Sequence, residues 1–148
     1  MNLTIYLAGE IHTDWRDRIA AGVEEHKLPV TILSPVTDHE ASDNVGVDIL
    51  GAEDDPFWKD RKGAGVNAVR TRTAIQRSDV VVVKFGEQYR QWNAAFEAGY
   101  AAALGKSLIV LHSGDLTHAL KEIDAAAMAV AESPEQVLEI LRYVTPRK

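Results

Sequence analysis

The sequence predicts an α/β fold with a parallel sheet of five strands. Two observations support this prediction. Short apolar runs alternate with longer amphipathic ones along the chain, which is typical of βαβ units. With 148 residues, the chain also has the ordinary length of one domain with one core. We therefore expect a single domain over residues 1–148.

The short apolar runs predict the strands. The clearest of them holds four consecutive valines. In chain order, the expected strands are Leu3 to Ala8, Val30 to Leu33, Val80 to Lys84, Leu108 to Leu111 and Met128 to Val130.

The longer amphipathic segments predict the helices. Ser133-Pro134-Glu135-Gln136 has the form of a capping box with proline at the first helical position. Gly105 follows Leu104 at a point where a helix would end in the left-handed conformation. In chain order, the expected helices are Asp14 to His26, Val66 to Arg77, Asn93 to Leu104, Thr117 to Asp124 and Pro134 to Tyr143.

The segment from about residue 34 to residue 65 is expected to be a long irregular loop. It is rich in Asp and Glu and includes Pro56-Phe57-Trp58. Loops of this length are usually lids or linkers. Two interpretations stay open: a solvated acidic loop anchored by its aromatic residues, or a lid whose Phe57 or Trp58 stacks on a flat ligand.

Composition and charge limit the possible partners. The net charge of −6 argues against nucleic acid polymers and anionic membrane surfaces as general partners. The chain has no cysteine, which excludes disulfides, thiolate nucleophiles and Cys-ligated zinc. We find no signal peptide and no apolar run long enough to span a bilayer, so we expect a cytoplasmic protein without a membrane partner.

Several common cofactor and catalytic motifs are absent. There is no phosphate-binding P-loop, and Gly63-Ala64-Gly65 does not follow a strand as a dinucleotide fingerprint does. The histidines lack metal-ligand spacing, and no G-x-S-x-G nucleophile elbow is present. We therefore expect no cofactor and no metal. His12 and His112 are interpreted more simply as structural or solvent-facing residues.

The carboxyl ends of the strands are the expected ligand site, as in open α/β sheets generally. Gly9 and Glu10 follow the first strand, and Lys84 ends the third. Gly9 suits a tight turn or a close backbone approach. We expect these three residues to contact the substrate.

The helix over 93–104 carries one carboxylate among small residues. Its Ala and Gly residues allow close packing on the sheet, which holds Glu97 near the protein body. Asn93, Glu97 and Tyr100 share one helical stripe because they are four and three residues apart. Asn93 and Tyr100 are therefore substrate-binding candidates, although Glu97 could instead cap its own helix or pair with a neighbour.

Three segments together resemble the nucleoside 2-deoxyribosyltransferase superfamily, and most closely its YtoQ-type subgroup. The resemblance covers most of the chain in order and spacing, and its most specific part has the form E-x-G-x-A-x-A-L-G-K. It implies a flavodoxin-like, doubly wound sheet with helices on both faces. The three segments are Ile5 to Gly9, Ser78 to Val82 and Phe96 to Lys106.

The resemblance also implies a mechanism. In that superfamily, the Glu of this segment attacks the anomeric carbon of a nucleoside and expels the base, and a Tyr of the first strand orients it. Carried over, these residues are Glu97 and Tyr6. A carboxylate suits an oxocarbenium-like transition state, which it stabilises and can capture covalently. The superfamily further implies a homo-oligomer.

The chain departs from the family pattern in the helix before the third strand. Thr71 stands where family members usually carry Asp, within the basic pattern Asn67 to Thr73. Arg70 and Arg72, together with Lys84, could bind a phosphate group, because guanidinium groups contact phosphate oxygens bidentately. The alternative is a solvated helix face.

Two functions therefore compete. The first is cleavage or transfer of the N-glycosidic bond of a nucleoside or nucleotide, with Trp58 as a further substrate contact. The second is a non-catalytic nucleoside- or nucleotide-binding module, which the Thr71 substitution favours. A phosphoacceptor regulator on the same fold is disfavoured because the first strand ends in Ala8-Gly9 and not in an acidic site.

Overall fold

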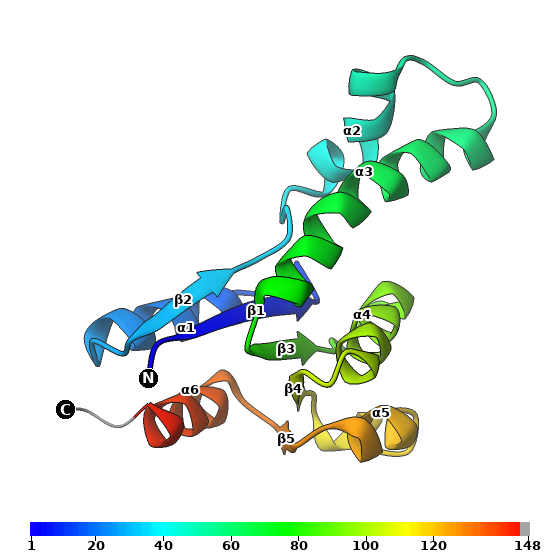
Figure 1. Ribbon diagram of the computed structural model, residues 1–148. Helices are drawn as coiled ribbons and strands as arrows, with labels where there is room; N and C mark the ends of the chain where they lie inside the picture. The colour runs from blue at the N-terminus through cyan, green and yellow to red at the C-terminus, as the bar shows by residue number, and fades with distance from the viewer. Residues whose placement is uncertain (146–148) are drawn as a thin grey trace.

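Five parallel strands form the centre of the structure in the order β2-β1-β3-β4-β5 (Figure 1). The computed structural model describes residues 1–145. This strand order is that of flavodoxin-like folds, so the predicted fold class is confirmed. The strands are β1 (Leu3–Gly9), β2 (Val30–Leu33), β3 (Val80–Lys84), β4 (Ser107–Leu111) and β5 (Ala129–Ala131).

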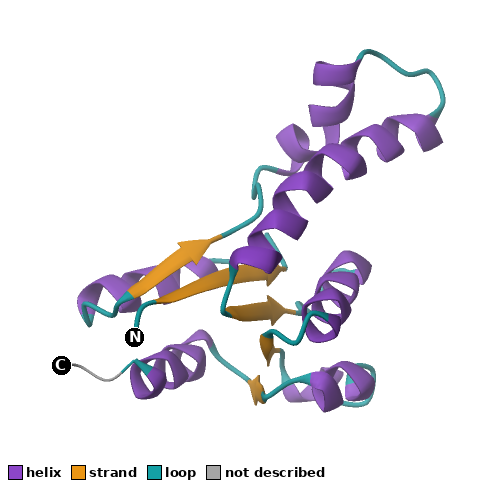
Figure 2. Cartoon of the chain, in the orientation of Figure 1, coloured by secondary structure: helices purple, strands orange, loops and turns teal. Residues whose placement is uncertain are grey.

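Helices cover both faces of the sheet (Figure 2). On one face, α1 (Trp15–Glu25) and α6 (Pro134–Val144) pack against alternate strand residues such as Ile5 and Leu7. On the other face, α4 (Trp92–Ala103), α5 (Lys121–Ala126) and the end of α3 pack around Tyr6 and Ala8. The period-2 alternation of β1 therefore divides the core into two layers.

The element predictions agree with the structure to within a few residues, except in two places. The helix expected from residue 117 begins at residue 121, after a 3₁₀ turn, η1 (Gly114–Leu116). The larger error concerns the segment 34–65. The prediction of an irregular loop there was wrong, because this segment forms α2 (His39–Leu50) and the first half of α3 (Pro56–Arg77).

Aspartates explain the helices in this segment. The Asp38 carboxylate accepts a hydrogen bond of 2.9 Å from the backbone N–H of Ala41, and it caps α2. The Asp55 carboxylate does the same for α3 through Phe57 N–H at 2.9 Å, with Pro56 in the first turn. The acidic residues that suggested a solvated loop are thus partly N-caps.

The helices α2 and α3 pack against each other and extend away from the sheet (Figure 1). They approach closely at Gly46, where an added Cβ would lie 2.2 Å from the backbone nitrogen of Gly63. Asn67 fastens the pair by donating to the carbonyl oxygen of Ser42 at 3.0 Å. Within residues 1–145, no helix is long and apolar enough to cross a membrane.

The chain turns sharply after β1 at Gly9. Its φ of +100° lies in the region that side chains disfavour, and an added Cβ would lie 2.1 Å from the carbonyl oxygen of Lys84. Glycine therefore permits the close contact between the ends of β1 and β3.

We expect Gly9→Ala to lower the free energy of unfolding by about 2 kcal/mol or more, because it adds backbone strain and a clash with β3. Urea denaturation measures this loss. Gly99→Ala is the matched control. Gly99 lies within α4 with nothing near its added Cβ, so alanine there should stabilise by about 0.5–1 kcal/mol. Equal stabilities of the two variants would contradict this account of Gly9.

Candidate active site

A pocket of about 500 Å³ lies at the carboxyl end of β1, between α3 and α4. Several of the catalytic and substrate-binding residues predicted from the sequence line this pocket, together with residues of α2. Its charged lining residues are Arg61, Arg70 and Arg72 on α3, Asp43 on α2 and Glu97 on α4; Gly9, His39, Asn93, Thr71 and Phe96 also line it.

Small residues hold Glu97 in this pocket. Ala94, Ala98 and Ala101 of α4 are buried against the sheet, which lets the helix lie close to β3 and β4. Glu97 is half-buried as a result. Burial raises the pKa of its carboxyl group to about 7, and the positive charge of Arg16 opposes the rise. The group can therefore be protonated or ionised near neutral pH.

Tyr6 lies on the β1 face that α4 covers and does not line the pocket itself. Its side chain is fully buried, and its hydroxyl has no hydrogen-bond partner of acceptable geometry within residues 1–145. Burial, followed by the negative charge of Glu97, raises the pKa of Tyr6 to about 12, although the Thr71 side chain facing it opposes this. Tyr6 is therefore a neutral hydroxyl close enough to Glu97 to feel its charge.

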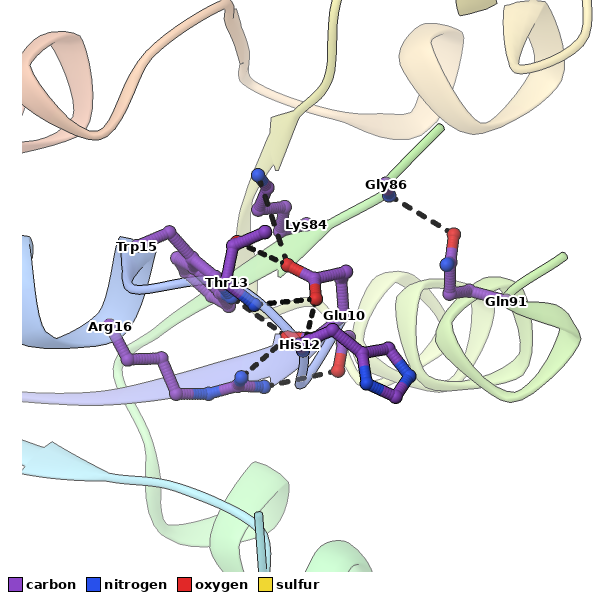
Figure 3. A network of polar contacts seen from close by, with 9 residues as sticks. Glu10, His12, Thr13, Trp15, Arg16, Lys84, Gly86 and Gln91 are labelled. Atoms are coloured by element: carbon purple, nitrogen blue, oxygen red, sulfur yellow. Dashed lines mark hydrogen bonds and ion pairs between the residues drawn. The ribbon is translucent and has the colours of Figure 1, made fainter. Parts of the chain in front are cut away.

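Glu10 does not line this pocket, and its side chain lies in a polar network of its own (Figure 3). Its carboxylate accepts hydrogen bonds from the backbone N–H of His12 and from the backbone and hydroxyl of Thr13, at 2.9 and 2.5 Å. Lys84 Nζ lies 3.9 Å away. Burial would raise the pKa of Glu10, but these bonds and this charge hold it below its usual value. Glu10 fixes the loop after β1.

Glu10 and Lys84 line a second pocket of about 570 Å³, on the other side of this loop. Gln91 also lines it, and its side-chain oxygen accepts from the backbone N–H of Gly86 at 3.0 Å. The structure thus separates the predicted substrate contacts. Gly9, Arg70, Arg72 and Asn93 share a pocket with Glu97, whereas Glu10 and Lys84 lie in its neighbour.

Tyr100 and Trp58 line neither pocket. The Tyr100 ring stacks on Phe96 at a centroid distance of 6.3 Å, and its hydroxyl accepts from Gln76 Nε2 at 2.9 Å. Trp58 lies in the first turn of α3, edge to face with Phe57 at 5.1 Å, and its side chain is largely exposed.

Sequence reasoning missed several residues near the site, including His39 and Asp43 of α2. Phe96 and Arg61 line the Glu97 pocket, and Arg16 lies buried behind Gly9. The burial of Arg16 could have been predicted from the sequence, because Arg16 adjoins Trp15 and Ile19 on the apolar face of α1. In the described part of the chain, no group of three or more His, Asp or Glu side chains could hold a metal ion.

The pKa of Glu97 makes stability depend on pH. It is about 7 in the folded protein and near 4.5 in an unfolded chain. Between these values the folded state binds the proton more tightly, so the free energy of unfolding falls as the pH rises. We expect Glu97→Gln to lack this fall. Between pH 4 and pH 8, the free energy of unfolding of the variant should therefore rise by about 1–3 kcal/mol relative to that of the native protein.

Urea denaturation at both pH values measures the gain. Glu122→Gln is the control, because the Glu122 side chain is 80% exposed, and this variant should follow the native protein. The same pH dependence in native and Glu97→Gln proteins would contradict the burial of the Glu97 carboxyl.

Comparisons with known proteins identify the family of the chain. A family model described as Nucleoside 2-deoxyribosyltransferase YtoQ matches residues 6–145. The chain is also 40% identical over 144 residues to a Bacillus subtilis (strain 168) protein named YtoQ, and the match covers 97% of each chain.

Solved structures of low sequence identity share the fold. A conserved protein from Enterococcus faecalis V583 matches with a TM-score of 0.67 and 14% identity, over 97% of this chain and 99% of its own. The 2-deoxyribosyltransferase of Bacillus psychrosaccharolyticus matches with a TM-score of 0.57 and 19% identity, over 98% and 97%. The CMP N-glycosidase BcmB of Clostridium botulinum matches with a TM-score of 0.50 and 14% identity, over 95% and 98%.

The family model and the 40% identical relative each match nearly the whole chain, which confirms the resemblance found in the sequence. The chain belongs to the YtoQ nucleoside 2-deoxyribosyltransferase family.

Proposed function

We propose that this chain cleaves or transfers the N-glycosidic bond of a nucleoside or nucleotide, with Glu97 as the nucleophile and Tyr6 as its positioning partner. The observation that carries the proposal is the half-buried Glu97 carboxyl in a pocket, whose charge helps to raise the pKa of the buried Tyr6 hydroxyl. Family membership and the activities named for two structural neighbours support the same reaction class.

The proposed reaction has two steps. An oxygen of ionised Glu97 bonds to the anomeric carbon while the bond from that carbon to the base breaks, and the base leaves with the bonding electrons and takes a proton from water. Water or a second base then attacks the same carbon, which releases Glu97. Tyr6 donates a hydrogen bond to the carboxylate and keeps one oxygen directed at the sugar.

Three arginines favour a substrate that carries a phosphate. Arg61, Arg70 and Arg72 line the pocket against two carboxylates, so its charged lining is net positive. The CMP N-glycosidase among the structural neighbours is named for a nucleotide substrate. We therefore propose a nucleoside monophosphate as the preferred substrate, with Asn93 as a further contact. A homo-oligomer and a cytoplasmic location remain predictions.

A second candidate function is ligand binding without catalysis. Thr71 lines the pocket at the place where the superfamily usually has Asp, so it offers a hydroxyl and no carboxylate. Under this alternative, nucleotides would raise the melting temperature without being consumed. Release of free base from any member of a nucleoside and nucleotide panel would exclude it.

We expect Glu97→Gln to lower base release by about 10³-fold or more, because the nucleophile is lost. Tyr6→Phe should lower the rate of base release about tenfold, which is the effect of losing one hydrogen bond. Chromatography of released base measures both. Glu122→Gln is the control and should retain native activity. Unchanged turnover in Glu97→Gln would refute the mechanism.

We expect a nucleoside 5′-monophosphate to show a KM at least about tenfold below that of the matching nucleoside, the effect of one charge-assisted hydrogen bond. Arg70→Ala and Arg72→Ala should reduce this preference. Arg77→Ala tests the specificity of the effect, because Arg77 lies on the same helix outside the pocket. Equal KM values for the two substrates would rule out phosphate recognition.

A further inference from the structure

Arg16 is a buried cation that binds the end of β1. Its residue is 9% exposed, and its guanidinium donates three hydrogen bonds, all to backbone carbonyl oxygens. Nε donates to Leu7 at 2.9 Å, Nη2 to Gly9 at 3.1 Å and Nη1 to Glu10 at 2.5 Å. Figure 3 shows the contact with Glu10, with the Arg16 side chain reaching from α1 to the loop after β1.

Two of these carbonyls, those of Leu7 and Gly9, have no partner on β2 because β1 is longer than this neighbouring strand. The pairing of β1 with β2 ends at Tyr6 and Leu33, whereas its pairing with β3 continues to Gly9 and Lys84. Carbonyl groups two residues apart point to the same edge of a strand, so Leu7 and Gly9 face the side that β2 has left. Arg16 supplies the donors there that a longer β2 would have supplied.

No ion pair neutralises this guanidinium within residues 1–145. Its three partners are neutral carbonyls, and buried charges are usually paired with an opposite charge. The nearest acids along the chain, Asp17 and Asp14, are exposed, and the Glu10 carboxylate is already bound by Thr13, His12 and Lys84. Arg16 holds the carbonyl of Gly9, which lines the Glu97 pocket, so its buried charge lies at the end of the sheet beside that pocket.

We infer that Arg16 is a positioning residue for Glu97: it holds the loop that borders the pocket and supplies the buried positive charge that favours the ionised carboxylate. The effect of the Arg16 charge on the Glu97 carboxylate does not depend on whether the protein catalyses a reaction. Its consequence for catalysis rests on the proposed function.

Other charged groups also line the Glu97 pocket, but each stabilises the ionised Glu97 carboxylate less than Arg16 does. Arg61, Arg70 and Arg72 on α3 are exposed, so solvent screens their charges. On α2, His39 lies 3.4 Å from Asp43, and these two side chains face each other. Tyr6 is neutral because burial raises its pKa. Consistently, Arg16 is the charge that lowers the pKa of Glu97 against the effect of burial.

The test is an NMR titration of the Glu97 side-chain carboxyl carbon, with Glu97→Gln identifying its resonance. Arg16→Gln removes the charge but keeps two N–H donors, whereas Arg16→Lys keeps the charge and loses the planar fork. We expect the titration midpoint to rise by about half a pH unit or more in Arg16→Gln, the effect of removing a nearby opposite charge. It should stay near the native value in Arg16→Lys.

Arg18→Gln is the matched control. Arg18 lies on the same helix, but it is exposed and pairs with Glu135 at 2.5 Å, so its loss should leave the midpoint unchanged. Circular dichroism checks folding, and Arg16→Met is a second neutral variant of similar length if Arg16→Gln does not fold. If a folded Arg16→Gln or Arg16→Met protein has the same Glu97 titration midpoint as the native protein, the proposed role of the charge is wrong.

The titration needs no turnover, so its result is independent of the proposed function. In variants that release base, the acidic limb of the kcat/KM profile should move upward by the same amount as the NMR midpoint. A purely structural role for Arg16 would lower the melting temperature of both the Gln and Lys variants and leave both midpoints in place.

Discussion

The site depends on the mismatch in length between β1 and β2. Because β1 runs past the last residue of β2, its final carbonyls need donors from elsewhere, and Arg16 provides them. The turn at Gly9 then brings the chain against the end of β3. These two contacts fix the loop that separates the two pockets. Gly9 at the start of that loop lines one pocket, and Glu10, the next residue, lines the other.

Two glutamates show how environment decides the chemistry of one side-chain type. Glu10 is almost completely buried, yet its pKa is low, because hydrogen bonds and Lys84 replace the lost water. Glu97 is less buried, but no hydrogen bond to its carboxylate is formed within residues 1–145, so burial dominates and raises its pKa. The first glutamate is held in one state by its partners. The second can exchange protons near neutral pH, and its oxygens are free for a ligand.

Much of the fold could be predicted from the sequence, because buried parallel strands appear as continuous apolar runs and the alanines of α4 indicate close packing. The segment 34–65 could not, since Asp38 and Asp55 look the same in a solvated loop and at a helix N-cap. The site was predicted only in outline. The sequence indicates which residues reach the carboxyl edge of the sheet, but a single turn at Gly9 decides on which side of the loop Glu10 lies.

The helices α2 and α3 form one wall of the Glu97 pocket, yet they pack mainly on each other. Among the residues of this pair, Ala74 and Ile75 at the end of α3 belong to the buried core of the sheet. The α2–α3 pair is therefore packed on the core of the sheet only at the end of α3. Local unfolding of the pair would uncover Glu97 while the five strands stay intact. Admission of a ligand would then cost the free energy of opening these two helices.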